Sequence, residues 1–169
     1  MISIRTASES DAAAVAKIYK PYVETTAITF EYDAPDMEEM KKRIQTVKQH
    51  WPYLVAVEDG KVLGYAYASS LKSRPAYYPS VETSIYVDAS HHQAGVGRAL
   101  YTELEKELAK QDVTNLYACI AAPKGEDLYL NEDSIHFHTH MGYQIVGRFH
   151  NCALKFNRPY DVVWMEKII

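Results

Sequence analysis

The sequence predicts a single α/β domain in which helices cover both faces of a mixed sheet. Three observations support this: a length of 169 residues, 47% apolar and 24% charged residues, and strand-like runs that alternate with amphipathic helices. The length fits one ordinary domain over residues 1–169, and the composition is that of a globular protein. We expect a mostly antiparallel sheet whose central strands splay near a glycine-containing turn.

The charge balance and the amino-terminal residues narrow the classes of function. Lys and Arg number 18 against 22 Asp and Glu, a net charge of -4, so no long-range positive field would attract nucleic acid. The chain opens with Met1 to Arg5 and then turns polar and alanine-rich, without an apolar run long enough for export or membrane spanning. We therefore expect a cytoplasmic protein that binds neither nucleic acid nor a membrane.

Cysteine and tyrosine usage adds two expectations. Cys119 and Cys152 both lie in apolar, strand-like stretches, and a reducing compartment keeps such residues as thiols. We interpret them as small core residues. The 14 tyrosines indicate half-buried pocket walls, because a phenol hydroxyl still needs a hydrogen-bond partner.

The first part of the chain is predicted to form a strand and two helices. Residues 2–6 alternate as a strand, and the polar residues 8–11 then give helix start signals. A loop over 25–33 precedes a second helix, which Pro35 and Asp36 open. The inner sides of the helices show helical spacing, with Val15, Ile18, Tyr19 and Tyr22 in the first and Met37, Met40, Ile44 and Val47 in the second. Pairs four residues apart support the second helix, Glu38 with Lys42 and Glu39 with Arg43.

The middle of the chain contains the clearest hairpin. After Pro52, residues 53–58 and 61–70 form two β-rich runs around Asp59-Gly60. A third run over 80–87 leads through a glycine-containing segment into another helix, with Val96, Leu100, Leu104 and Leu108 aligned. The order strand, glycine turn and helix is typical of a phosphate site.

The last part of the chain completes the sheet. Residues 115–121 are apolar almost throughout, which predicts a central strand covered on both faces. Residues 134–141 form a short helix that Gly142 ends, and strands follow over 143–150 and 161–166.

The strongest local motif lies between the third strand of this middle section and the helix that follows. Its residues are Gln93, Ala94, Gly95, Val96, Gly97 and Arg98. Backbone N–H groups at such a helix start can face a diphosphate, although glycine there also permits close packing, and the residues alone leave both interpretations open. A Rossmann loop is disfavoured, because the third glycine is missing and half of a domain precedes the strand.

The stretch from His92 to Gly97 resembles the pyrophosphate loop of the GCN5-related N-acetyltransferase (GNAT) superfamily, which reads Arg or Gln, two residues, Gly, one residue, and Gly or Ala. His92 stands here in place of the first Arg or Gln. Within that superfamily the chain looks like the phosphinothricin acetyltransferase branch over nearly its full length. The landmarks are Ile18-Tyr19, Thr29-Phe30-Glu31, Tyr53-Leu54-Val55-Ala56, Gly64-Tyr65-Ala66-Tyr67, Arg74-Pro75-Ala76-Tyr77, Val81-Glu82-Thr83-Ser84-Ile85-Tyr86-Val87, and Ser134 leading to His138 and Gly142-Tyr143.

The resemblance implies a GNAT fold and acetyl-CoA as co-substrate. It implies that the pantetheine arm meets backbone groups of Ile85, Tyr86 and Val87, that the diphosphate lies on residues 93–98, and that Asn131 reaches the cofactor just before the fourth helix. Relative to the usual form of the branch, residues 124–130 are an insertion, which we interpret as a surface-loop difference of small entropic cost. A homodimer, common among such relatives, stays open.

An acceptor ammonium must lose a proton before its nitrogen can attack a thioester, so the site needs a base. The resemblance places the family's proposed base at Glu82, which on a strand shares a face with Ser84 and Tyr86. From the residues alone Glu82 also fits an ordinary exposed strand glutamate. The resemblance places His138 near the thiol end of the groove, with its role open between acid, base relay and substrate contact.

Four side chains are candidates for the acceptor site, and three histidines lie close together in the sequence. Acceptor walls are predicted at Phe30, Tyr32, Arg74 and Tyr77. The guanidinium of Arg74 suits an acceptor carboxylate, while plain aromatic packing and a solvated arginine stay open as alternatives. His136 and His140 share a helix face but His138 points away, so no metal site is predicted.

The sequence as a whole predicts an acetyl-CoA-dependent N-acetyltransferase acting on the primary amine of an amino acid or a similar small molecule. Two alternatives stay open, namely acetylation of a polyamine or a protein N-terminus, and a sensor that binds acetyl-CoA without turnover. The sensor does not require Glu82, so the presence of this glutamate favours the enzyme.

Overall fold

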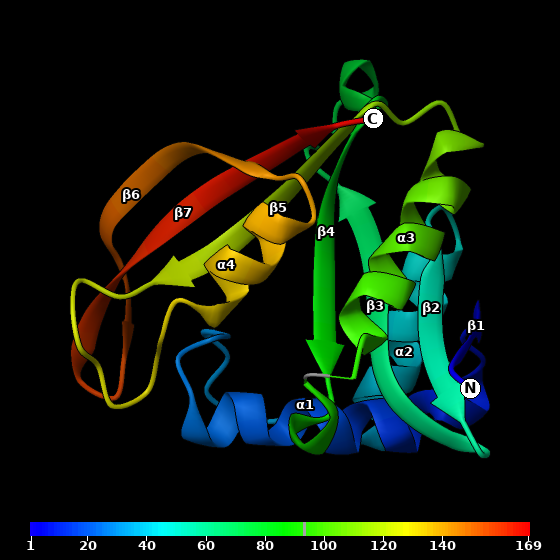
Figure 1. Cartoon of the computed structure of the whole chain (residues 1–169), viewed down its shortest axis with the longest axis horizontal. Helices are drawn as coiled ribbons and strands as arrows, with labels where there is room; N and C mark the ends of the chain where they lie inside the picture. The colour runs from blue at the N-terminus through cyan, green and yellow to red at the C-terminus, as the bar shows by residue number, and fades with distance from the viewer. Residues whose placement is uncertain (93) are drawn as a thin grey trace.

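The computed structural model describes residues 1–92 and 94–169, and within them the chain forms a seven-stranded sheet flanked by helices (Figure 1). The strands follow the spatial order β1 (Ser3–Thr6), β2 (Tyr53–Glu58), β3 (Lys61–Ser70), β4 (Ser80–Val87), β5 (Asn115–Ala122), β7 (Arg158–Ile168) and β6 (Gln144–Lys155). The α-helices are α1 (Ala12–Thr25), α2 (Met37–Lys48), α3 (Val96–Ala109) and α4 (Asp133–His140). Short 3-10 turns precede or join them: η1 (Glu9–Asp11), η2 (Pro75–Tyr77) and η3 (Ala89–His91).

The sheet is mixed and mostly antiparallel, which confirms the predicted fold class. Only β4 and β5 run parallel, and α3 makes the crossover between them, as a parallel pair requires. Their ladder is short, pairing 80–82 with 115–117. Beyond Glu82 and Tyr117 the two strands diverge, which is the predicted splay.

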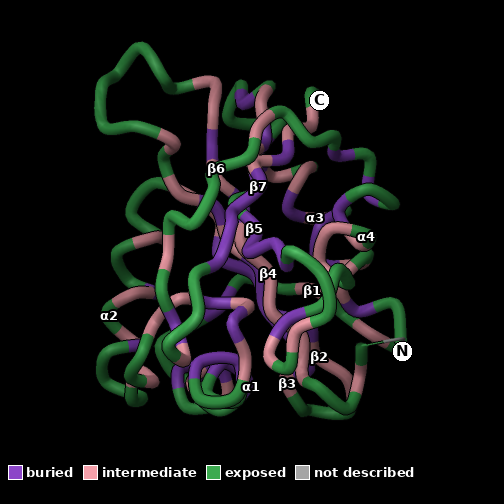
Figure 2. Tube along the Cα trace, turned by 90° about the vertical axis from the view of Figure 1, so that its left-hand side faces the viewer, coloured by how far each residue is buried: buried purple, intermediate pink, exposed green. Residues whose placement is uncertain are grey.

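Helices cover the two faces of the sheet unequally. On one face α3 packs its aligned leucines into the larger core, together with Val81 of β4. On the other face α1 and α2 cover β2 and β3 through a second core, and α1 lies across the end of β4 beside the glycine-containing turn (Figure 1). The buried stretches gather in the central strands (Figure 2). No helix of the described residues is both long and apolar enough to cross a membrane.

Of the two β-hairpins, one has a turn that its sequence predicts and the other does not. Asp59 and Gly60 form the two-residue turn between β2 and β3, with φ of 50° and 75°, as this dipeptide predicts. Phe156 and Asn157 make an equivalent turn between β6 and β7, with φ of 51° and 58°. Phe is rare in this conformation, so the sequence does not indicate a turn at this position. The strands predicted over 143–150 and 161–166 therefore stop short of the turn, whereas β6 and β7 extend to it.

Two expectations about the carboxyl-terminal half are wrong. Strand β5 is not covered on both faces: Leu116, Ala118 and Ile120 are buried, whereas Cys119 is exposed. On this second face Asn115 and Tyr117 are half-buried, and Ala121 at the end of the strand is buried in the third core. Cys152 is exposed as well, and neither cysteine is a core residue.

The insertion over 124–130 packs onto the protein more closely than a free surface loop. Leu130 is buried in a third core with Ala27 and Tyr160. The Tyr160 hydroxyl donates to Asp127 at 2.9 Å. The Ala27 N–H donates to the carbonyl of Tyr129 at 3.0 Å. The insertion therefore supports the loop between α1 and α2.

Candidate active site

The divergence of β4 and β5 opens a narrow cleft at the centre of the sheet. Its walls include Ser84 and Ile85 of β4, Ala118 and Cys119 of β5, and His138 of α4. Because the ladder ends at Glu82, backbone groups beyond it are free to bind a ligand that lies between the strands. The cleft contains two of the predicted backbone contacts, Ile85 and Tyr86.

The glycine-containing turn lies at the far end of β4, where α3 begins. Gly95 is the N-cap residue of α3 with φ of 80°, and a Cβ there would meet nothing within 4 Å. This left-handed conformation favours glycine. Gly97 is different, since a Cβ would lie 2.9 Å from the ring of Phe137. Close packing therefore explains Gly97, whereas Gly95 faces open space before the free N–H groups of a helix start.

The other residues of the predicted diphosphate site surround this turn. Ala94 and Arg98 are exposed, and the side chain of Val96 is buried. The prediction for Gln93 lies outside the described residues. Strand β4 ends beside His92, whose Nε2 lies 2.6 Å from the hydroxyl of Tyr22.

Asn131 lies away from the cleft. Its Oδ1 accepts from the backbone N–H of Asp133 at 2.9 Å, just before α4. Its side chain lines a shallow hollow with Pro123 and Arg158, whereas the neighbouring Leu130 reaches the cleft. Contact of Asn131 with the cofactor stays a prediction.

Glu82 lies where the β4–β5 ladder ends, directly beside Tyr117. It is half-buried, and Val81 and Thr83 on the opposite face are fully buried. Burial raises the pKa of its carboxyl group, and no described residue donates a hydrogen bond to it. A carboxylate with a raised pKa and a free lone pair is suited to accept a proton near neutral pH.

A buried hydrogen-bond network fixes His138 behind the cleft. Nδ1 donates to the carbonyl of Ser134 at 2.7 Å, and Nε2 accepts from the hydroxyl of Tyr101 at 2.9 Å. Burial lowers the pKa of His138 to about 4, so the ring is neutral at pH 7. Thr83 lies 3.3 Å from the Tyr101 hydroxyl and extends the network, since its own hydroxyl forms a hydrogen bond of 2.9 Å with the hydroxyl of Tyr143. Both ring nitrogens of His138 are thus engaged by the protein itself.

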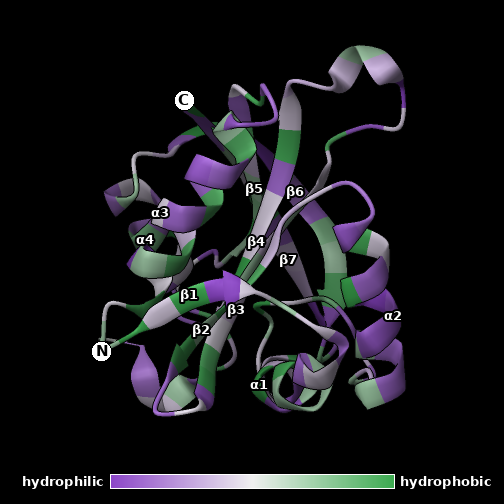
Figure 3. Cartoon of the chain, turned by 90° about the vertical axis from the view of Figure 1, so that its right-hand side faces the viewer, coloured by the Kyte–Doolittle hydropathy of each residue, from purple (hydrophilic) through white to green (hydrophobic). Residues whose placement is uncertain are grey.

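The predicted acceptor walls lie on two separate loops. Phe30 packs 6.1 Å from the ring of Tyr160, and the Tyr32 hydroxyl donates to the carbonyl of Leu154. Arg74 and Tyr77 are exposed on the β3–β4 loop, which reaches out from the sheet on the side of α2 (Figure 3). The structure therefore joins Phe30 and Tyr32 to the carboxyl-terminal hairpin and leaves Arg74 and Tyr77 apart from them.

An ion-pair cluster beside the site was only partly predicted. The predicted Glu39–Arg43 pair forms at 3.2 Å. Arg43 also donates two hydrogen bonds, of 2.7 and 3.0 Å, to the carboxylate of Glu31. The Tyr19 hydroxyl donates to the same carboxylate. Glu31 belongs to the landmark Thr29-Phe30-Glu31, but its partner Arg43 lies 12 residues away, beyond the reach of helix-spacing rules.

Cys119 faces the same open side of the sheet as Glu82. Although Cys119 is partly exposed, it lines the cleft between β4 and β5, where desolvation by burial, with Glu82 and Cys152 adding to it, raises the pKa of its thiol to about 12. The thiolate is the reactive form, so alkylation by iodoacetamide at pH 7 should be about a hundredfold slower than that of free cysteine. The measurement uses a Cys152→Ser variant, in which Cys119 is the remaining cysteine. A rate like that of free cysteine would contradict the placement of Cys119 in a poorly solvated site.

No group of three or more metal-binding side chains is found among the residues that the structure describes.

The sequence and the fold are matched by known proteins. Residues 4–164 match the acetyltransferase (GNAT) domain family. A phosphinothricin N-acetyltransferase from Streptomyces coelicolor is 34% identical over 170 residues, which cover 98% of this chain and 95% of the relative.

Two solved structures extend this similarity. A ribosomal-protein-alanine N-acetyltransferase from Brucella melitensis has a TM-score of 0.90 at 31% identity, covering 99% of each chain. A phosphinothricin acetyltransferase from Sinorhizobium meliloti in complex with acetyl-CoA has a TM-score of 0.89 at 29% identity, covering 99% of this chain and 88% of the other.

The chain therefore belongs to the GNAT family of acetyltransferases. It is an acetyl-CoA-dependent N-acetyltransferase.

Proposed function

We propose that this enzyme acetylates the α-amine of an amino acid or an amino-acid analogue, with Glu82 as the base. The observation that carries the proposal is a half-buried carboxylate with a raised pKa at the residue where the β4–β5 ladder ends and the cleft begins. The relative from Streptomyces coelicolor, which is named for phosphinothricin, supports an amino-acid-like acceptor. A cytoplasmic location stays a prediction from the sequence, and the sequence leaves the oligomeric state open.

The proposed cofactor groove follows β4 to the start of α3. The thioester end lies in the cleft near Ser84 and Ile85, and the diphosphate lies on the free N–H groups after Gly95. The open space around Gly95 supports this placement, because a phosphate can approach the backbone closely there. The acetyl-CoA complex of the Sinorhizobium meliloti relative supports the choice of ligand.

The proposed reaction needs one proton transfer before nitrogen attacks. Glu82 takes a proton from the acceptor ammonium, and the free lone pair then forms a bond to the thioester carbonyl carbon. Collapse of the tetrahedral intermediate breaks the carbon–sulfur bond, the nitrogen loses its second proton and the departing thiolate gains one, so the products are the acetamide and the thiol of coenzyme A. Backbone N–H groups near Val87, where the strands have diverged, are suited to stabilise the developing oxyanion.

The structure favours a positioning role for His138 over proton transfer. Its Nε2 already accepts from Tyr101, and its Nδ1 proton is held by the carbonyl of Ser134. Burial also lowers the pKa of the ring to about 4, which opposes uptake of a proton at pH 7. We propose that His138 holds α4 against the cleft.

The acceptor class is tested with a panel of amines, following release of the coenzyme A thiol. We expect turnover with amino acids and less with spermidine or with a peptide that has a free N-terminus. The peptide is included because the Brucella melitensis relative is named as a ribosomal-protein-alanine N-acetyltransferase. Faster turnover of the peptide would replace the proposed acceptor, and acetyl-CoA binding without turnover of any amine would favour a sensor.

Arg74 is proposed to hold the acceptor's carboxylate, because a guanidinium matches a carboxylate with two parallel bonds. Arg74→Ala should raise the KM of the acceptor more than the KM of acetyl-CoA, in steady-state assays that vary each substrate in turn. Lys72→Ala is the matched control, since Lys72 is an exposed cation on the same loop. Equal effects on both substrates would remove Arg74 from the acceptor site.

A further inference from the structure

We infer that Lys155 is a positioning residue, whose buried ammonium group holds the loop between α1 and α2 in place as one wall of the cleft. Lys155 itself does not line the cleft, so it acts on acceptor turnover only through this loop. The inference rests on the proposed function, since it takes the cleft as the place where the acceptor meets Glu82.

Lys155 is a charged side chain in the interior of the protein. It is the last residue of β6, before the turn at Phe156 and Asn157, and only 3% of its surface is exposed. Its Nζ donates to the carbonyl of Val23 at 2.7 Å and to the carbonyl of Thr29 at 2.8 Å. A buried ammonium group is costly unless it is hydrogen-bonded, so these two bonds fix both the lysine and the chain that it binds.

The carbonyl of Val23 lacks its usual partner in α1. In a continued helix it would accept from the N–H of residue 27, four positions further on. The helix ends at Thr25, and the Ala27 N–H donates to the carbonyl of Tyr129 instead. Lys155 therefore supplies the donor that the end of the helix lacks, and a cation is favourable at this end of a helix.

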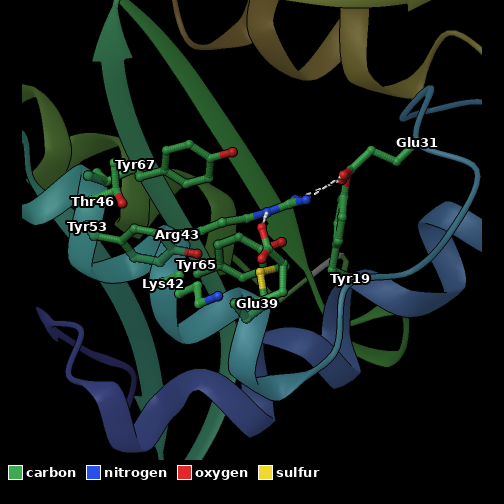
Figure 4. Close-up of a pocket in the computed structure, with 11 residues that line it drawn as sticks. Tyr19, Glu31, Glu39, Lys42, Arg43, Thr46, Tyr53, Tyr65 and Tyr67 are labelled. Carbon is green, nitrogen blue, oxygen red and sulfur yellow. Dashed lines mark hydrogen bonds and ion pairs between the residues drawn. The ribbon is translucent and has the colours of Figure 1, made fainter.

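The second carbonyl belongs to the loop itself. Thr29 is buried, and its hydroxyl lies 2.6 Å from the hydroxyl of Tyr19. Two residues further on, Arg43 of α2 reaches the carboxylate of Glu31 (Figure 4). Burial lowers the pKa of Lys155, and Glu31 opposes that shift by favouring the ammonium form. The loop is thus tied to α1, to α2 and, through Lys155, to the β6–β7 hairpin.

Ile28 connects the loop to the cleft. It lies along the chain between the two carbonyls that Lys155 binds, and its side chain lines the cleft. It packs against the second core, as Tyr86 does, and Tyr86 shares its face of β4 with Glu82. The loop therefore forms a wall on the side of the cleft where Glu82 lies. A shift of this wall changes the position of the acceptor relative to the base.

The other contacts between the hairpin and this region are easier to lose. The Tyr32 hydroxyl donates to the carbonyl of Leu154, but 66% of Tyr32 is exposed. The ring of Phe156 stacks on Tyr129 at 4.0 Å between centroids. Only the loss of Lys155 among these would leave two buried carbonyls without their donor, which costs more than the loss of a solvated hydrogen bond.

The test replaces Lys155 with Met, which has a similar length and no donor. The acceptor is the amine that the wild-type enzyme acetylates fastest in the amine panel. In Lys155→Met we expect kcat/KM for this acceptor to fall by about tenfold to a hundredfold, because small misplacements of a reacting group have effects of this size. Affinity for acetyl-CoA, measured by calorimetry, should stay unchanged, because the proposed cofactor groove follows β4 and α3.

Hydrogen exchange followed by mass spectrometry gives a readout that does not depend on turnover. Lys155→Met should speed exchange in residues 24–33 and leave β4 and α3 unchanged. Lys48→Met is the matched control, because Lys48 also donates to a backbone carbonyl, that of Ala7 at 2.6 Å, and should keep both the acceptor kinetics and the exchange of the loop. If Lys155→Met does not fold, Lys155→Gln, which is shorter but keeps a donor, takes its place in both measurements.

The outcomes separate the positioning role from the function. Wild-type kcat/KM for the acceptor in the folded variant, or an equal loss of affinity for acetyl-CoA, would overturn the role of Lys155 and leave the proposed function intact. Faster exchange across the whole protein would do the same, because it would show a general loss of stability. A wild-type enzyme that acetylates no amine of the panel would instead contradict the proposed function, and the inference would fall with it.

Discussion

Glu82→Gln should lower kcat by about a hundredfold to ten-thousandfold, the usual contribution of a positioned general base. The amide keeps the shape of the side chain at the end of the β4–β5 ladder but cannot accept the acceptor's proton. Affinity for acetyl-CoA, measured by calorimetry, should stay unchanged, because the carboxylate serves the amine and not the thioester.

The pH profile gives a second readout of the same change. A base at Glu82 acts only when it is deprotonated, so kcat/KM of the wild-type enzyme should fall as pH drops through the pKa of Glu82, which burial has raised. In Glu82→Gln this acid limb should vanish, and activity should recover partly at high pH, where more of the free amine is already neutral.

Glu166→Gln is the matched control for this experiment. Glu166 is a half-buried strand glutamate opposite Tyr117 on β7, and its substitution should preserve turnover. Wild-type turnover and an unaltered pH profile in Glu82→Gln would show that Glu82 is not the base and that another group accepts the proton.

Gly95→Val should weaken acetyl-CoA binding by about tenfold or more, because a β-branched residue resists φ of 80°. To relieve this strain the turn would move, and the N–H groups at the start of α3 would no longer point to the diphosphate. Calorimetric titration with acetyl-CoA measures the loss directly.

Gly60→Val separates binding from strain. Gly60 has φ of 75°, and a Cβ there would also meet nothing within 4 Å, but it lies in the β2–β3 turn. Both variants should lose similar thermal stability, and only Gly95→Val should lose affinity. Unchanged affinity in Gly95→Val would move the diphosphate away from this turn.

The fold was predictable wherever local chemistry decides it. Asp59-Gly60 specifies its own turn, and the leucine spacing of α3 specifies one buried face. The predicted order of strand, glycine turn and helix is present at β4 and α3. By contrast, the turn at Phe156 and the open face of β5 depend on what packs nearby, and sequence periodicity does not report that.

The site was predictable in its strand residues but not in its long-range contacts. The position of Glu82 on β4 follows from strand alternation and from the resemblance of its motif. The ion pair of Glu31 with Arg43 needs the loop after α1 to fold back onto α2. The two glycines of the turn looked equivalent in sequence, and only the position of Phe137 shows that Gly97 serves packing.

The most direct test of the central claim is to follow an isotopically labelled acetyl group. The enzyme is mixed with acetyl-CoA labelled in the acetyl group and with an amino acid that the amine panel shows to be a substrate, and the products are resolved by mass spectrometry. We predict that the label appears on the α-nitrogen of the amino acid with one equivalent of coenzyme A thiol released. Thiol release without label on any amine, or label retained on the protein, would contradict acetyl transfer to a small-molecule amine.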